Sequence, residues 1–149
     1  MYDKKIKEEF WTRFGQFMAL HPSVSGERVS WLNYKTGVRH VQAKIMVEAD
    51  RAYFGIEVSS PDHTTRDKLY RQLLSDLTIL AGCSGNEWQN NPTHSSGGKT
   101  VSAVYQEMTG VNVFLQSDWP AIISFLKSLL LCFDEFWTDQ RDLYAMISG

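Results

Sequence analysis

The chain has 149 residues, of which 43% are hydrophobic, 13% aromatic and 21% charged. This length fits a single domain, residues 1–149, and a chain of this size buries roughly two-thirds of the surface that its unfolded form exposes. With 15 basic and 17 acidic residues the net charge is -2. Such a balance excludes a strong overall field toward nucleic acid or an anionic membrane, although it leaves room for a local basic patch.

Cysteine spacing and hydropathy set expectations about the compartment. Cys83 and Cys132 lack metal-site spacing and each lies in an apolar, helix-like context, which predicts buried free thiols and a reducing compartment. The most apolar run, residues 121–133, contains Lys127 and is too short to span a bilayer, and the first residues have no apolar signal segment. We therefore expect a cytoplasmic protein without a membrane association.

The first half of the chain reads as a helix followed by strands. Apolar residues at helical spacing predict a helix over residues 3–20, with Asp3 as its cap and Pro22 just beyond its end. Three strand-like runs then predict an antiparallel meander: residues 30–35, 38–48 and 52–60. The expected turns of this meander are Thr36-Gly37 and Asp50-Arg51.

The second half repeats this alternation. A leucine stripe predicts a helix over residues 64–81, with Asp62 or Thr64 as cap and Gly82 as stop. Residues 87–99 are expected to pass from a short strand into a mobile loop, and strands are expected at 100–108 and 111–116. A long final helix starts at Ser117 or Asp118, with Pro120 in its first turn.

These elements predict an α+β fold with helices packed on a mainly antiparallel sheet, in the order α-βββ-α-β(β)β-α. Two motifs suggest chemistry but lack its context. Gly98-Lys99-Thr100 resembles the end of a phosphate-binding loop, yet Thr93 replaces the required glycine and a strand follows instead of a helix. The four histidines show no metal-site spacing. No cofactor and no metal site are therefore predicted.

The meander places polar and aromatic side chains on one face of the sheet. Counting from a turn at Asp50-Arg51 puts Lys44 opposite Glu57, while an apolar layer, including Phe54 and Ile56, faces the helices. The predicted ligand surface comprises Trp31, Asn33, Lys35, Arg39, His40, Lys44, Tyr53 and Glu57.

Two interpretations of this face stay open. In the first, Lys44 and Glu57 form a cross-strand ion pair, which contributes under about 1 kcal/mol when exposed, and Trp31 and Tyr53 pack under a helix. In the second, the aromatic and polar groups stack on and hydrogen-bond a base, a peptide or a small molecule. The basic residues near the first turn would add positive charge to that surface.

The order of elements is also distantly similar to the core of the restriction-endonuclease-like nucleases, which bind a divalent metal through an Asp and a Glu-x-Lys motif. Asp50 and Glu57 are the candidate carboxylates. Ser59 stands where the lysine is required, and Lys44 on the neighbouring strand is the candidate replacement. The alternative prediction is thus a degenerate or atypical metal-dependent nuclease.

Four segments carry a family resemblance over nearly the whole chain: Phe10-Trp11-Thr12, residues 31–37 (WLNYKTG), Val111-Asn112-Val113-Phe114 before Asp118-Trp119-Pro120, and Asp134-Glu135-Phe136-Trp137. They are similar to the bacterial family called domain of unknown function 4268. The resemblance implies no catalytic residue. Members occur alone or behind nuclease-like regions, which favours a non-catalytic binding or accessory domain linked to nucleic-acid processing or defence. Its expected partner is a protein, a nucleic acid or a second copy of the chain.

Overall fold

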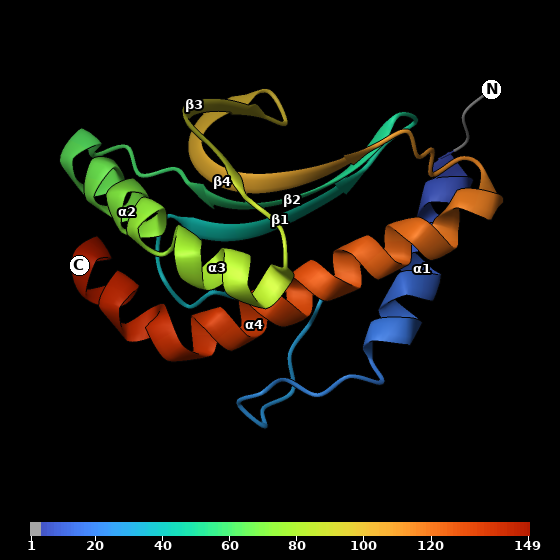
Figure 1. Ribbon diagram of the computed structural model, residues 1–149, viewed down its shortest axis with the longest axis horizontal. Helices are drawn as coiled ribbons and strands as arrows, with labels where there is room; N and C mark the ends of the chain where they lie inside the picture. Colours follow the sequence, from blue (N-terminus) through green and yellow to red (C-terminus); the bar gives the residue numbers. More distant parts are fainter. Residues whose placement is uncertain (1–3) are drawn as a thin grey trace.

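A four-stranded antiparallel sheet with helices packed on one face forms the fold, in a computed structural model that describes residues 4–149 (Figure 1). The strands are β1 (Val41–Val47), β2 (Arg51–Val58), β3 (Gln89–Ser96) and β4 (Lys99–Thr109), in the spatial order β1-β2-β4-β3. The helices are α1 (Lys4–Met18), α2 (His63–Ser75), α3 (Leu77–Ser84) and α4 (Trp119–Ser148), with a short 3-10 helix, η1 (Gln116–Asp118), before α4. The predicted α+β class and the alternation of helical and strand regions are confirmed.

The first helix follows the predicted apolar spacing. Phe10, Phe14 and Met18 succeed one another at four-residue intervals, so they share one face of α1, and all three are fully buried. The chain leaves the helix after Met18, and Pro22 then disfavours a return to helical backbone. The predicted cap, Asp3, lies outside the described residues.

The β1–β2 hairpin turns one residue earlier than the sequence predicts. Its two turn residues are Ala49 and Asp50, and the Glu48 N–H donates to the Arg51 carbonyl at 2.8 Å. Moving the turn centre by one residue moves the strand pairing by two, so Glu57 lies opposite Gln42 instead of Lys44. Side chains alternate with a period of two, and the predicted division into an apolar and a polar face therefore survives the shift.

The strand predicted at residues 30–35 does not form. Side chains anchor this segment to the helical layer instead: the Trp31 Nε1–H donates to the His21 carbonyl at 3.0 Å, and the Tyr34 hydroxyl donates to Asp134 at 2.6 Å. The Thr36-Gly37 turn is equally not a hairpin turn, since the Thr36 hydroxyl donates to the Val41 carbonyl at 2.7 Å. The segment is an irregular loop held by its aromatic side chains.

The helix predicted over residues 64–81 is two helices that meet at Asp76. This side chain is buried and accepts a 2.6 Å hydrogen bond from the Tyr144 hydroxyl. The same carboxylate accepts from the Gln72 Nε2 at 3.3 Å, and the backbone at Asp76 departs from helical geometry with a φ of -93° and a ψ of 2°. Asp62 caps α2 as predicted, while the stop of α3 is Gly85, with a left-handed φ of 78°, and not Gly82.

The β3–β4 hairpin replaces the loop predicted after residue 87. Gly97 and Gly98 form its turn with φ angles of 55° and 81°, a conformation that glycine adopts without strain. The strand predicted at 111–116 is absent, because side chains take over its backbone hydrogen bonds. The Asn112 N–H donates to Asp118 at 2.9 Å, which bends the chain toward η1.

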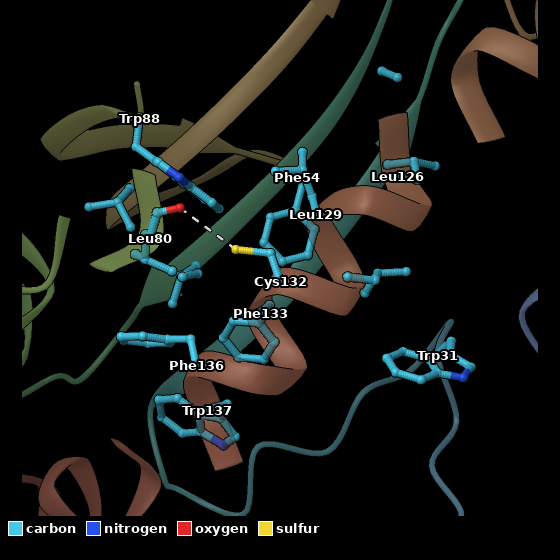
Figure 2. Close-up of a cluster of buried hydrophobic side chains, with 14 of the residues drawn as sticks. Trp31, Phe54, Leu80, Trp88, Leu126, Leu129, Cys132, Phe133, Phe136 and Trp137 are labelled. Atoms are coloured by element: carbon cyan, nitrogen blue, oxygen red, sulfur yellow. Dashed lines mark hydrogen bonds between the residues drawn. The ribbon is translucent and has the colours of Figure 1, made fainter. Parts of the chain in front are cut away.

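Helix α4 runs beneath the sheet, and the hydrophobic core lies between the two (Figure 1). Phe133 lies near the middle of α4 and contacts Phe54 of β2 at 5.9 Å and Trp137 at 5.5 Å between ring centroids. Figure 2 shows the rings of Phe54 and Phe133 between α4 and β2, with Leu126 on the same helix. The predicted apolar face of β2 thus covers this core on the side of the sheet.

Cys83 of α3 and Cys132 of α4 form a disulfide, with their Cα atoms 5.5 Å apart. The prediction of free thiols is wrong, because each helical context was judged alone while α3 and α4 pack side by side. The cysteine argument for a reducing compartment falls with it, and the cytoplasmic location stays a prediction. Among the helices of residues 4–149, none is both long and apolar enough to cross a bilayer.

Candidate functional site

The structure brings together three of the predicted ligand-surface residues: Lys44, Tyr53 and Glu57, all on the sheet face away from the helices. Trp31 is buried in the core below the sheet. The others lie on the loop that leads into β1, outside this face: Asn33, Lys35, Arg39 and His40. The broad surface predicted from the meander is therefore a much smaller site around Glu57.

Glu57 is a buried carboxylate with one oxygen occupied by protein donors. Its side chain projects from β2, and the residue is 4% exposed. The Tyr53 hydroxyl donates to Oε2 at 2.8 Å, and the Ser96 hydroxyl donates to the same oxygen at 2.6 Å. Within residues 4–149 the other oxygen, Oε1, receives no hydrogen bond. Oε1 is not among the buried side-chain atoms of the described residues that lack a partner, so this oxygen is accessible to a ligand.

Tyr53 reaches Glu57 by lying flat along its own strand. A Cβ on Gly55 would lie 2.6 Å from Tyr53 Cζ, so the ring covers the glycine and fills the space that a side chain would need. The ring also stacks on His94 of β3, with centroids 5.7 Å apart. Burial, followed by the charge of Glu57 and the hydrogen bond to it, raises the pKa of Tyr53 above its ordinary 10.0. Tyr53 therefore keeps its proton and remains a donor to Glu57.

A cavity of ≈ 170 Å³ opens beside Glu57, beneath the β3–β4 turn. Its lining residues are Gln42, Lys44, Glu57, Ser59, Ser96, Gly97, Lys99 and Val101. The Lys44 ammonium crosses from β1 to this turn, since its Nζ lies 3.0 Å from the position that a Cβ on Gly97 would occupy. The cavity is below the range of about 300–1,000 Å³ that is usual for drug-sized ligands. It suits a small polar molecule.

The lining groups divide into acceptors and donors. The carboxylate of Glu57 only accepts hydrogen bonds, while the ammonium groups of Lys44 and Lys99 only donate. Glu57 is buried, Lys44 is half-buried and Lys99 is exposed, so the negative group lies deeper than the positive groups. Among the described residues, no three His, Cys, Asp or Glu side chains are grouped to hold a metal ion. The cavity can thus bind a molecule through both kinds of charge.

The residues of the nuclease alternative are not assembled. Asp50 lies in the β1–β2 turn and Glu57 lies near the far end of β2, seven residues away. At about 3.3 Å per strand residue this separation is roughly 23 Å, far too long for one metal ion to bridge. Lys44 shares the cavity with Glu57, but the direct partners of that carboxylate are Tyr53 and Ser96.

Sequence reasoning missed Ser96, Gly97 and Lys99, which form one wall of the cavity. They come from a segment that was predicted to be a loop because asparagine, proline and serine dominate residues 89–96. One signal was present: two adjacent glycines, Gly97 and Gly98, directly before a strongly β-like run are typical of a two-residue hairpin turn. Recognising that hairpin would have paired Ser96 with Lys99 next to the turn.

A larger hollow of ≈ 630 Å³ is lined by the loop between α1 and β1, including His21, Ser23 and Trp31. Its buried polar groups already have protein partners. The Ser23 hydroxyl donates to Asp134 at 2.8 Å, and the Trp31 Nε1–H donates to the His21 carbonyl. Nothing at this hollow calls for a ligand, which leaves the Glu57 cavity as the stronger candidate.

Comparison with known proteins gives a family and no function. Neither the curated proteins nor the solved structures contain a significant match to this chain. The family match begins at Ile6 in α1 and ends at Arg141 in α4, so it includes the sheet and every residue that lines the cavity. With residues 6–141 matched, the chain belongs to the family described as domain of unknown function (DUF4268).

Proposed function

We propose that this protein is a non-catalytic binding domain whose ligand is a small polar molecule held in the Glu57 cavity. The observation that carries the proposal is the Oε1 oxygen of Glu57, which is accessible beside the cavity while Oε2 accepts both protein hydroxyls. A hydrogen bond to a charged group contributes about 1.5–3 kcal/mol, so Oε1 offers a strong acceptor to a donor on a ligand.

The geometry around Glu57 supports binding over catalysis. Tyr53 and Ser96 both hold the carboxylate in place, and the stack of Tyr53 on His94 fixes the donor itself. A rigid, pre-oriented acceptor loses little conformational entropy when a ligand arrives. An accessory role in nucleic-acid processing or defence enters the proposal from the family resemblance alone, and it would require a protein or nucleic-acid partner.

Protein-observed NMR with a library of small polar metabolites tests the proposal. Binding in the cavity should shift the backbone amide signals of residues 96–99 in a saturable way. Glu57→Gln removes the charge and should weaken that binding at least tenfold, whereas Glu135→Gln, an exposed glutamate on α4, should bind as the natural protein does. If no compound shifts these signals, or if Glu57→Gln binds equally well, the cavity is not a ligand site.

A titration with Mg²⁺ or Mn²⁺ by calorimetry addresses the nuclease alternative. The roughly 23 Å between Asp50 and Glu57 predicts no specific site that uses both residues. A stoichiometric metal site that is lost in both Asp50→Asn and Glu57→Gln would contradict the binding proposal and restore the nuclease.

A further inference from the structure

The charges in the Glu57 cavity are arranged as two ends. The acceptor end is Oε1 of Glu57, a residue that is 4% exposed, and the donor end consists of Lys44 and Lys99, two lining residues that are more exposed. The Lys44 Nζ lies beside Gly97 and Lys99 follows the turn directly, so both lysines are next to the β3–β4 turn. Each end needs the opposite kind of group from a ligand.

A simple anion satisfies only the donor end. Inorganic phosphate or acetate would pair with Lys44 and Lys99, but it would also bring negative charge close to the buried carboxylate of Glu57. Electrostatic repulsion is strong where water is excluded, so that arrangement is unfavourable. A simple cation has the reverse problem, because it would pair with Glu57 and meet the two ammonium groups.

We propose that the ligand is a small free amino acid, bound with its ammonium group on Glu57 Oε1 and its carboxylate on Lys44 and Lys99. This inference rests on the proposed function and adds the ligand class. An amino acid carries both charges on adjacent carbon atoms, so one small molecule satisfies both ends of the cavity. Charge-assisted hydrogen bonds of this kind are about twice as strong as neutral ones.

The rest of the lining indicates which amino acid fits. The volume of ≈ 170 Å³ limits the side chain to a few atoms. Gln42 and Ser59 offer polar groups to that side chain, while Val101 is the only residue with an apolar side chain in the lining. A short hydroxyl side chain is favoured over an aliphatic or aromatic one, and L-serine is the probe that this lining selects.

The test compares four probes by the amide signals of residues 96–99: L-serine, sodium acetate, ethylammonium chloride and sodium phosphate, at equal concentration and ionic strength. L-serine should give saturable shifts at concentrations where the other three give none. Glu57→Gln and Lys99→Met should each weaken L-serine binding at least tenfold. Lys99 is exposed, so its variant folds even if Glu57→Gln does not. Lys68→Met, an exposed lysine on α2, is the matched control and should leave L-serine binding unchanged.

The outcomes separate this inference from the proposed function. If acetate or phosphate saturates these signals as well as L-serine does, the site is a plain anion site; the amino-acid inference is then wrong while the binding function stands. If none of the four probes and no compound of the metabolite library binds, both are wrong. Binding of L-serine that is unaffected by Glu57→Gln and Lys99→Met would locate it elsewhere and also overturn the inference.

Discussion

Replacing Gly55 with alanine tests how Tyr53 is positioned. A Cβ on Gly55 would lie 2.6 Å from Cζ and 2.9 Å from Cε1 of the Tyr53 ring, and closer still to the hydroxyl. The ring is buried and stacked against His94, so it has no free space in which to move. Gly55→Ala must therefore displace either the ring or the strand, and it must loosen the hydrogen bond from Tyr53 to Glu57.

The expected cost follows from these contacts. Overpacking a well-filled site costs about 1–3 kcal/mol. Losing the hydrogen bond from the Tyr53 hydroxyl to the Glu57 carboxylate adds about 1.5–3 kcal/mol. Alanine restricts the unfolded chain more than glycine does, and this effect offsets about 0.4–1 kcal/mol of the destabilisation. Gly55→Ala should thus lower the free energy of unfolding by about 2–5 kcal/mol, although alanine alone at this extended position would stabilise the strand.

Urea denaturation followed by tryptophan fluorescence measures this change, and a second background isolates its cause. In Tyr53→Val the ring is gone, so Gly55→Ala should cost nothing or stabilise slightly, and the two substitutions should show a coupling energy of about 2 kcal/mol or more. The reasoning would be refuted by a cost below about 0.5 kcal/mol in the natural protein. Equal costs in both backgrounds would refute it as well, because the ring would then not be responsible.

Three further predictions concern the contacts of α4. Reducing the Cys83–Cys132 disulfide, which closes a loop with a sequence separation of 49, should cost roughly 4 kcal/mol on the chain-entropy estimate; a variant with both cysteines changed to serine should show the same loss and no response to dithiothreitol. Asp134→Asn should destabilise by about 3 kcal/mol, because the buried carboxylate accepts two hydroxyl hydrogen bonds, whereas Glu135→Gln, its exposed neighbour, should stay within about 0.5 kcal/mol. Burial and the hydrogen bond to an aspartate raise the pKa of Tyr144 above 10.0. The unfolded chain then loses this proton first, so Tyr144 should contribute about 1.4 kcal/mol per pH unit to the fall in stability above pH 10. Tyr34 and Tyr53, whose pKa values are also raised, add to that fall. Tyr144→Phe should therefore reduce the slope by about one group's contribution, and an unchanged slope would contradict it.

The parts of the fold that the sequence predicts are those set by local periodicity. The faces of β1 and β2 follow from side-chain alternation, which tolerates a turn displaced by one residue. The buried stripe of α1 likewise follows from the spacing of Phe10, Phe14 and Met18. In both cases the signal depends on neighbours in the sequence and not on a distant partner.

The wrong predictions concern segments that distant side chains control. Residues 30–35 have a strand-like composition, yet Asp134, about one hundred residues later, binds Tyr34 and holds the segment as a loop. The leucine stripe is interrupted at Asp76, whose buried carboxylate binds Tyr144, 68 residues later. Neither contact leaves a local pattern, so no single-sequence argument of this kind could find it.

Local periodicity also predicts the part of the candidate site that β1 and β2 contribute, and it does not predict the part that β3 contributes. The predicted register placed Lys44, Tyr53 and Glu57 on one face of the sheet, because the alternation of side chains along each strand is enough to assign the face. Lys44 was predicted to pair with Glu57, but the hydrogen-bond partners of that carboxylate are Tyr53 and Ser96. Ser96 is 39 residues away on a strand with little β-propensity. The interpretation of Glu57 as half of a surface ion pair fails, because the curled β3–β4 hairpin buries it.

Four side chains of helix α4 hold segments that precede it in the chain. Asp134 binds the loop before β1, Trp137 donates to the Thr36 carbonyl at 2.7 Å, Tyr144 binds the α2–α3 junction, and Cys132 is bonded to α3. A ribosome synthesises these anchors after every segment that they hold. Nascent chains halted before α4 should therefore be digested readily by protease, whereas chains extended beyond α4 should resist it, so that folding is completed only when the last helix has been translated.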